Sequence, residues 1–326
     1  MHYLSLVLCL VVGGLGGEDL LFLGPGFGSF LKSDLIDLWS EDPINCDIPH
    51  YPLFNGDPEL NQIQGLEGAV INDRVTLCGG WYIGPPDSDH TYNSNTTNAC
   101  YYFDPDSREW ESFPGLHEDG HDGDSVMLPD GRWWILGGFN DENDYYDDTT
   151  ELYTEGQGWT PGPTLPMINT YNCAANLGEN FTLIAGGASP DTKNKTWLYD
   201  WGKLEYQEVM DLDIPAQNHA CIALDDENVM MAGGYSYSAG HGTLNTVSVF
   251  NLGTLAWTPV NPLPQPMQHH EMVRDGPDVL AMGGISGGGR IYRYKVGSGW
   301  SLENKMMTFD AYNFPALLVT RDMLGC

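Results

Sequence analysis

The sequence predicts an all-β protein in which six blades of four strands form a ring, the fold called a β-propeller. Three observations support this prediction. An apolar, strand-like segment ends on a Gly-Gly pair five times, at intervals of about 50 residues, which indicates a repeat architecture. An aromatic residue followed six or seven positions later by a second aromatic, usually tryptophan, comes after each pair. The two ends of the chain complement one another as halves of a further repeat. The second glycines of the pairs are Gly80, Gly138, Gly187, Gly234 and Gly284.

Each repeat is expected to contain four antiparallel strands. A short strand, such as residues 172–177, precedes the Gly-Gly strand and is joined to it by a tight turn. The two aromatics, for example Phe250 and Trp257, flank turn-forming residues and predict a hairpin. A proline-containing link then leads to the next repeat. Four antiparallel strands per repeat are typical of a propeller blade. The third repeat carries Tyr206 in the tryptophan position.

The chain ends predict the sixth blade. Residues 315–325 resemble the first two strands of a repeat, and residues 35–46 resemble the last two. We therefore expect one composite blade that joins both termini and closes the ring, which removes exposed sheet edges. Residues 35–326 then form a single propeller domain, and residues 18–34 have no assigned place or role.

Over residues 69–300 the pattern resembles the kelch repeat, in which an apolar strand, Gly-Gly, a variable loop and a spaced aromatic–Trp step recur. The chain departs from kelch repeats in two ways. Its third repeat lacks the tryptophan, and its first strands contain few arginines. The resemblance implies a kelch-type β-propeller. It also implies binding more often than catalysis, although a fold does not determine function.

The N-terminus predicts secretion. Residues 3–12 are an apolar core followed by small residues, so residues 1–17 are expected to be a signal peptide too short to span a bilayer. A buried strand is the alternative. No later segment is long and apolar enough for a membrane span. The oligomeric state, monomer or otherwise, is not specified by the sequence.

The charge balance limits the partners. The chain has 13 basic and 45 acidic residues, a net charge of −32. Such a surface repels nucleic acid and anionic membranes and attracts cations, Ca²⁺ or basic proteins. A purely solubilising role is the simpler interpretation. A hydrophobic content of 41% argues against disorder.

Six cysteines remain after the signal peptide, which suggests three disulfides in a secreted chain. Spacing alone allows about 15 pairings and matches no zinc motif. Placing the cysteines on the expected strands predicts a bridge within the composite blade, a bridge between neighbouring strands of the first blade, and a bridge between first strands of successive blades. These pairs are Cys46–Cys326, Cys78–Cys100 and Cys173–Cys221.

Long loops after the second strands are the expected binding apparatus, because long loops on a rigid scaffold commonly carry function. The alternative is solvated loop variation. These loops cover residues 81–99, 139–149, 188–195 and 235–245, and their candidate contact residues are Tyr145, Tyr146, Tyr235 and Tyr237. Three glycosylation sequons fall in predicted loops, at Asn95, Asn180 and Asn194.

Histidines near the start of the inner strands are weak metal candidates. Imidazole and carboxylate groups from several blades could bind a transition metal, although a polar ring around a solvated channel is the plainer interpretation. The positions considered are His117, His121, Asp122, Tyr171, His219, His269, His270 and Glu271. Residues 118–124 are carboxylate-rich and could hold Ca²⁺, but they lack the EF-hand spacing. We expect no obligatory cofactor.

The sequence favours a secreted, non-enzymatic module that binds an extracellular protein or glycan. It contains no G-x-S-x-G, HExxH, phosphate-loop or CxxC motif. One alternative is a metal-dependent oxidase resembling galactose oxidase, which would need copper, histidines, tyrosines and a thioether-forming cysteine. A second alternative is a glycosidase-like propeller with paired carboxylates in a central pocket.

Overall fold

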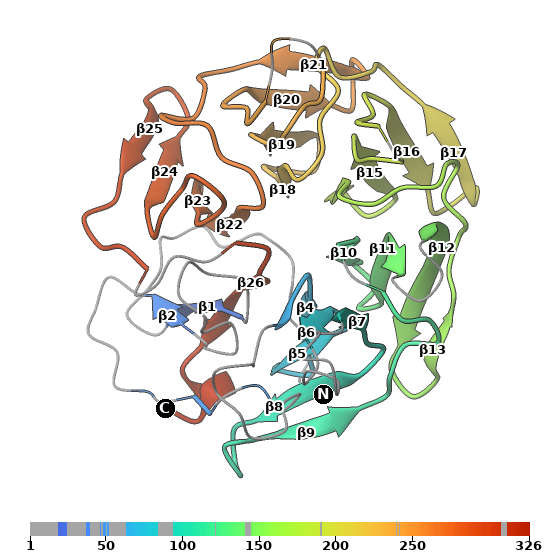
Figure 1. The fold of residues 1–326 in the computed structure, drawn as a ribbon, viewed down its shortest axis with the longest axis vertical. Coiled ribbons are helices and arrows are strands. Elements are labelled where there is room, and N and C mark those ends of the chain that lie inside the picture. Colours follow the sequence, from blue (N-terminus) through green and yellow to red (C-terminus); the bar gives the residue numbers. More distant parts are fainter. Residues whose placement is uncertain are drawn as a thin grey trace, which may run out of the picture.

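The computed structural model describes most of the chain beyond residue 62 and parts of the N-terminal segment. The described residues are 19–24, 37–39, 46, 48–49, 51, 63–83, 94–120, 122–140, 145–189, 191–238, 240, 242–307 and 312–326. They form seven antiparallel sheets, six of which are arranged in a ring around a central channel (Figure 1). The predicted six-bladed β-propeller is therefore confirmed.

Blades 1 to 5 have four strands each, ordered from the channel outward. Blade 1 contains β4 (Glu67–Ile71), β5 (Arg74–Cys78), β8 (Cys100–Asp104) and β9 (Glu109–Phe113). Blade 2 contains β10 (Asp124–Met127), β11 (Trp133–Asn140), β12 (Tyr145–Thr154) and β13 (Gly158–Pro161). Blade 3 contains β14 (Cys173–Leu177), β15 (Phe181–Ala185), β16 (Thr196–Asp200) and β17 (Glu205–Glu208). Blade 4 contains β18 (Ala220–Ala223), β19 (Asn228–Ala232), β20 (Val247–Asn251) and β21 (Ala256–Pro259). Blade 5 contains β22 (Glu271–Asp275), β23 (Asp278–Met282), β24 (Ile291–Lys295) and β25 (Gly299–Leu302).

Blade 6 joins the two ends of the chain, as predicted, but it divides the strands differently. Its order is β26 (Ala316–Thr320), β1 (Asp19–Leu23) and β2 (Asp37–Trp39), so the C-terminus supplies one strand and not two (Figure 1). After β26 the chain turns into the short 3-10 helix η1 (Asp322–Leu324). Strand β1, from the segment without an assigned place, takes the second position because it pairs with β26 along its whole length and buries Phe22.

Two of the predicted loops contain regular structure. A small sheet of β3 (Ile63–Gln64), β6 (Trp81–Ile83) and β7 (Ser94–Thr96) occupies part of the blade 1 loop and includes Asn95. In blade 2, β11 and β12 continue past the Gly-Gly pair, with Phe139 opposite Tyr146 and Asn140 opposite Tyr145. Tyr145 and Tyr146 therefore lie on a strand and not in a loop, because the pairing of β11 with β12 continues to these residues.

The paired aromatics of each repeat pack between the two outer strands. The ring centroids lie 4.6–5.6 Å apart in all five repeats, from Tyr199–Tyr206 to Phe103–Trp110. The indole of Trp159 donates a hydrogen bond to the Pro114 carbonyl, 2.7 Å away, in the link before its blade. The Tyr206 hydroxyl donates in the same way to the Pro163 carbonyl, at 3.1 Å. The tyrosine in the third repeat therefore keeps the role of the tryptophan that it replaces.

The structure contains the three predicted disulfides, although Cys326 follows η1 and does not lie at the end of a second C-terminal strand. Cys78–Cys100 joins β5 to β8 within blade 1, and Cys173–Cys221 joins the inner strands of blades 3 and 4. Cys46–Cys326 joins residues near the two chain ends, with a Cα–Cα distance of 5.4 Å.

In the part of the chain that is described, no helix has the length and apolar character needed to cross a bilayer.

Candidate functional site at the mouth of the central channel

A ring of six residues in the left-handed conformation surrounds one mouth of the channel. One such residue lies just before each inner strand, with φ between 53° and 65°. Going round the ring, the N–H groups of five of the six residues donate to the carbonyl of the counterpart in the preceding blade, in consecutive hydrogen bonds of 2.8–3.0 Å. We call these residues the amide ring. Its members are Gly65, Asp122, Tyr171, Asn218, His269 and Asn313.

The Gly-Gly pairs tie each blade to the next. The N–H of the second glycine donates to a carbonyl two positions before the amide-ring residue of the following blade, for example from Gly187 to Ala216 at 2.8 Å and from Gly234 to Met267 at 2.8 Å. Gly187 and Gly234 both have a φ of +98°, a backbone conformation that residues other than glycine rarely adopt. The repeated glycines are therefore needed for contact between blades.

His219 and His270 lie between blades, where they pack against these glycines. Each follows an amide-ring residue, and their exposed fractions are only 5% and 3%. A Cβ on Gly186 would lie 2.5 Å from the His219 ring, and a Cβ on Gly233 would lie 2.7 Å from the His270 ring. Burial lowers the pKa of His219 to about 4 and that of His270 to about 3, so both are neutral. Their side chains are therefore buried beside the Gly-Gly pairs and are not exposed to the channel.

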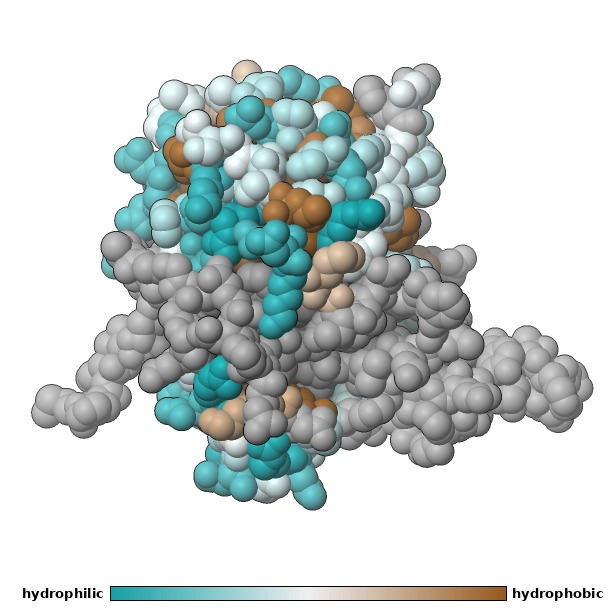
Figure 2. Space-filling view, turned by 90° about the vertical axis from the view of Figure 1, so that its left-hand side faces the viewer, coloured by the Kyte–Doolittle hydropathy of each residue, from teal (hydrophilic) through white to brown (hydrophobic). Residues whose placement is uncertain are grey.

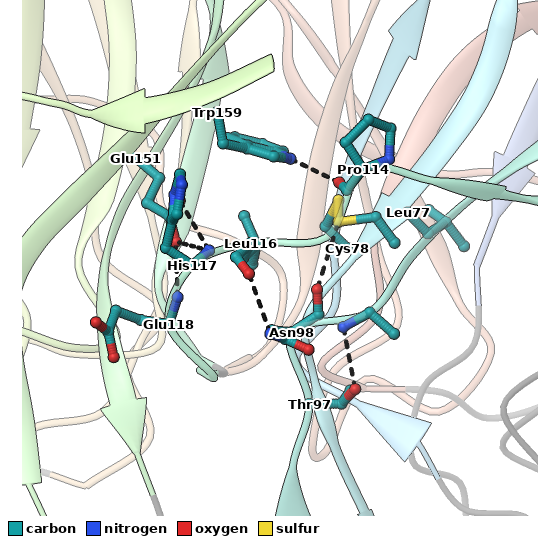
Figure 3. Close-up of a disulfide and its surroundings, with 12 residues drawn as sticks. Leu77, Cys78, Thr97, Asn98, Pro114, Leu116, His117, Glu118, Glu151 and Trp159 are labelled. Atoms are coloured by element: carbon teal, nitrogen blue, oxygen red, sulfur yellow. Dashed lines mark hydrogen bonds and ion pairs between the residues drawn. A yellow bond between two sulfur atoms is a disulfide. The ribbon is translucent and has the colours of Figure 1, made fainter.

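The other histidine candidates are also separated. His269 belongs to the amide ring, and its ring meets Tyr171 at 5.8 Å. His121 lies outside the described residues. His117 pairs with Glu151 between blades 1 and 2, where the carboxylate accepts hydrogen bonds from the His117 and Glu118 amides and from His117 Nδ1 at 2.6 Å (Figure 3). The described histidines therefore lie in different environments and do not form one cluster.

The carboxylates of residues 118–124 do not converge on a shared cation position in the described part of this stretch. The Asp122 carboxylate accepts a hydrogen bond from Asn313 Nδ2 in blade 6. The Asp124 carboxylate accepts from the Ser125 amide at 2.6 Å and from the Ala174 amide of blade 3. The interpretation of this stretch as a Ca²⁺ loop therefore has no support from these two side chains.

A cavity of about 360 Å³ opens beside the amide ring, over blades 3 to 5. Aromatic and amide side chains dominate its lining, and none of its lining residues is a carboxylate, lysine or arginine. Two of the predicted contact residues, Tyr235 and Tyr237, are among the lining residues. The lining residues are Tyr171, Ala188, Gln217, Asn218, Tyr235, Tyr237, Gln268 and His269. We call it the channel-mouth cavity.

Several lining groups are oriented for hydrogen bonding or stacking. Tyr235 and Tyr237 meet edge to face at 4.9 Å, and Tyr237 is 64% exposed. The side-chain oxygens of Gln217 and Asn218 are buried without a hydrogen-bond partner. Burial lowers the pKa of His269, which keeps its ring neutral. The sequence analysis missed Gln217 and Asn218 because amides belong to no chemical motif, and only the cavity identifies them as site residues.

Three carboxylates begin inner strands further along the channel. Glu67, Asp124 and Glu271 are the first residues of β4, β10 and β22. Burial raises the pKa of all three side chains, to about 8 for Glu67 and about 7 for Asp124, and repulsion by neighbouring carboxylates raises those of Glu67 and Glu271 further. At neutral pH this group therefore retains protons that isolated carboxyls would lose.

Glu67→Gln is expected to stabilise the protein in alkaline solution. The folded-state pKa of Glu67 lies above its ordinary value of 4.5, so its contribution to stability is present below that value and is lost as the pH rises towards about 8. The variant should exceed the wild type by roughly 1–3 kcal/mol near pH 9 and converge with it near pH 4. Urea unfolding across this range measures the difference, with exposed Glu205→Gln as the control. Identical pH profiles for wild type and Glu67→Gln would contradict this prediction.

The fold and site define a six-bladed β-propeller with a polar, aromatic channel mouth. No protein-family model matches the chain. The chain is 27% identical over 171 residues to the tRNA wybutosine-synthesizing protein 4 of Candida albicans, which covers 48% of this chain and 24% of that protein. It is 30% identical over 128 residues to the dynein alpha chain of the flagellar outer arm of Chlamydomonas reinhardtii, which covers 36% of this chain and 3% of that protein.

The chain thus spans about a quarter or less of the length of these curated relatives. Among solved structures it is similar to YjhT, with a TM-score of 0.66 at 12% identity, over 90% of this chain and 100% of that chain. This likeness concerns the fold alone.

Proposed function

We propose that the protein is a secreted, kelch-type propeller that binds neutral carbohydrate, carried by an extracellular partner, in the channel-mouth cavity. The observation that carries this proposal is the lining. Neutral amide and imidazole groups can hydrogen-bond sugar hydroxyls, and tyrosine rings offer amphipathic surfaces on which a sugar can stack. The side chains of Gln217 and Asn218 add amide groups to this lining.

Charge and surface character agree with a neutral ligand. The net charge of −32 disfavours anionic ligands, and no lysine or arginine lines the cavity to offset it. The face seen in Figure 2 is largely hydrophilic where it is coloured, with separate small apolar patches. The lining of the channel-mouth cavity therefore suits a small polar ligand. Three disulfides support the proposed extracellular location.

Tyr237→Ala is expected to weaken carbohydrate binding by at least about tenfold, because it removes an exposed aromatic platform at the cavity. Protein from the medium of animal cells is first screened on an array of neutral glycans, and the best glycan is then titrated by calorimetry. Leu204→Ala, at an equally exposed position on the β16–β17 turn, is the matched control. Absence of any glycan binding, or unchanged affinity in Tyr237→Ala, would overturn the proposal.

Glycoside hydrolysis is a second candidate, favoured by the carboxylates Glu67, Asp124 and Glu271. A general acid needs a raised pKa, and all three have one. The same glycan incubated with the protein distinguishes the two functions, since hydrolysis releases a new reducing end and binding does not.

The oxidase interpretation is not supported, because each of the six cysteines that the structure describes is disulfide-bonded, which leaves none for a thioether.

A further inference from the structure

The Cys173–Cys221 disulfide lies beside the buried His219 ring. The two sulfurs and one imidazole nitrogen all lie within 4.8 Å of one another. A tetrahedral zinc site with Zn–S of about 2.3 Å and Zn–N of about 2.0 Å places its ligand atoms at most about 3.8 Å apart. Breaking the sulfur–sulfur bond lets the two sulfurs separate towards that spacing. The three side chains therefore have the ligand types and the proximity of a metal centre.

The backbone explains why these three residues meet. His219 and Cys221 are two positions apart at the start of β18, and residues at this spacing in extended backbone point to the same side of a sheet. They face β14 of blade 3, where Cys173 is 1% exposed. Cys173 pairs with Ala185, whose carbonyl accepts the hydrogen bond from His219. The junction between blades 3 and 4 thus brings the group together.

His219 has the tautomer that a metal ligand requires. Its Nε2 lies 3.1 Å from the Ala185 carbonyl oxygen, so Nε2 carries the hydrogen and donates it. The lone pair is then on Nδ1, which is buried and makes no hydrogen bond of 3.5 Å or less, although the ring also interacts with the Gln217 backbone. Metal-binding histidines commonly donate their other N–H to a backbone carbonyl in this way. The unsatisfied nitrogen is an observation independent of the two sulfurs.

We propose that the reduced form of this group binds a zinc or other thiophilic metal ion through Cys173 Sγ, Cys221 Sγ and His219 Nδ1. A dithiol reductant supplies two electrons and two protons to the Cys173–Cys221 bond and becomes a disulfide itself. The metal then displaces the two thiol protons into solvent. The group is consequently a disulfide under oxidising conditions and a metal centre under reducing ones. This inference does not depend on the proposed carbohydrate site.

The test is an anaerobic titration of the fully reduced, full-length protein with Co²⁺, followed by competition with Zn²⁺. We expect one equivalent to produce a thiolate-to-cobalt charge-transfer band that Zn²⁺ abolishes. Cys173→Ser/Cys221→Ser should lose this band. The control variant Cys78→Ser/Cys100→Ser removes a disulfide that is not part of the proposed metal site, and it should keep the band. His219→Gln should weaken affinity by at least about tenfold, whereas His270→Gln, at the equivalent position of blade 5, should not.

Two further measurements keep the proposal falsifiable if a variant or the reduced chain unfolds. Bound Zn²⁺ should protect Cys173 and Cys221 of the reduced wild type from alkylation, as mapped by mass spectrometry, more than the other four disulfide-forming cysteines. If the reduced chain is unfolded, Zn²⁺ should restore its near-UV circular dichroism. A reduced protein that neither binds Co²⁺ nor responds to Zn²⁺, or one whose binding survives Cys173→Ser/Cys221→Ser, would overturn the proposal.

Discussion

Replacing Cys46 and Cys326 with serine is expected to lower the free energy of unfolding by about 5 kcal/mol. The bridge closes a loop with a sequence separation of 280, and in the chain-entropy model the benefit of a disulfide grows with the length of the loop that it closes. It also holds the C-terminus, beyond β26, to residues near the start of the domain. This double variant should therefore be the least stable of the variants that lack one disulfide.

Cys78→Ser/Cys100→Ser provides the comparison, because that bridge has a sequence separation of only 22. The same model predicts a difference of about 2 kcal/mol between the two double variants. Urea denaturation followed by tryptophan fluorescence measures both under non-reducing conditions. A cost for the short loop that equals or exceeds the cost for the long one would show that ring closure depends on the pairing of β26 with β1 and not on the disulfide.

Gly186→Ala is expected to destabilise the protein by roughly 2–5 kcal/mol. Its φ of +62° is unfavourable for alanine by about 1–2 kcal/mol. The new Cβ would also lie 2.5 Å from both the Ala216 carbonyl oxygen and the His219 ring, neither of which has room to withdraw between packed blades. Backbone strain and overpacking therefore add at this position.

Gly156→Ala separates these two contributions, since its φ is +75° but nothing lies within 4 Å of the added Cβ. It should cost only about 1–2 kcal/mol. Thermal and urea unfolding of the two variants give the difference, and Gly186→Ala/His219→Ala should recover part of the larger loss by removing one of the clashing groups. Equal destabilisation by Gly186→Ala and Gly156→Ala would contradict the proposed contact between blades.

Local pattern in the sequence was sufficient for the blade count and the cysteine pairs. The Gly-Gly strands recur at a regular interval, and this interval places Cys78 next to Cys100 in one blade and Cys173 next to Cys221 in successive blades. The strand assignment in blade 6 could not be completed in this way. Residues 19–24 carry an apolar run before Gly24 that follows the repeat pattern, but Gly24 is not part of a Gly-Gly pair.

The site was harder to predict because one position along the chain changes the environment completely. His269 has a left-handed backbone and lies at the channel mouth, whereas His270, the next residue, lies between blades. An alignment of repeats groups the two, since it does not resolve which member of the pair takes the left-handed turn. Gln217 and Asn218 could not be ranked as site residues, because amides occur on every protein surface and only the cavity distinguishes them.

The amide ring also has a mechanical consequence for recognition. In an open array of repeats the terminal unit can fray by breaking one interface. Here neighbouring blades are linked by successive backbone hydrogen bonds from Asp122 round to Gly65, so the blades in between are held on two sides. The frame of the mouth is therefore preorganised, and a ligand entering it would be accommodated by rotation of side chains such as Tyr237 and not by hinge motion of a blade.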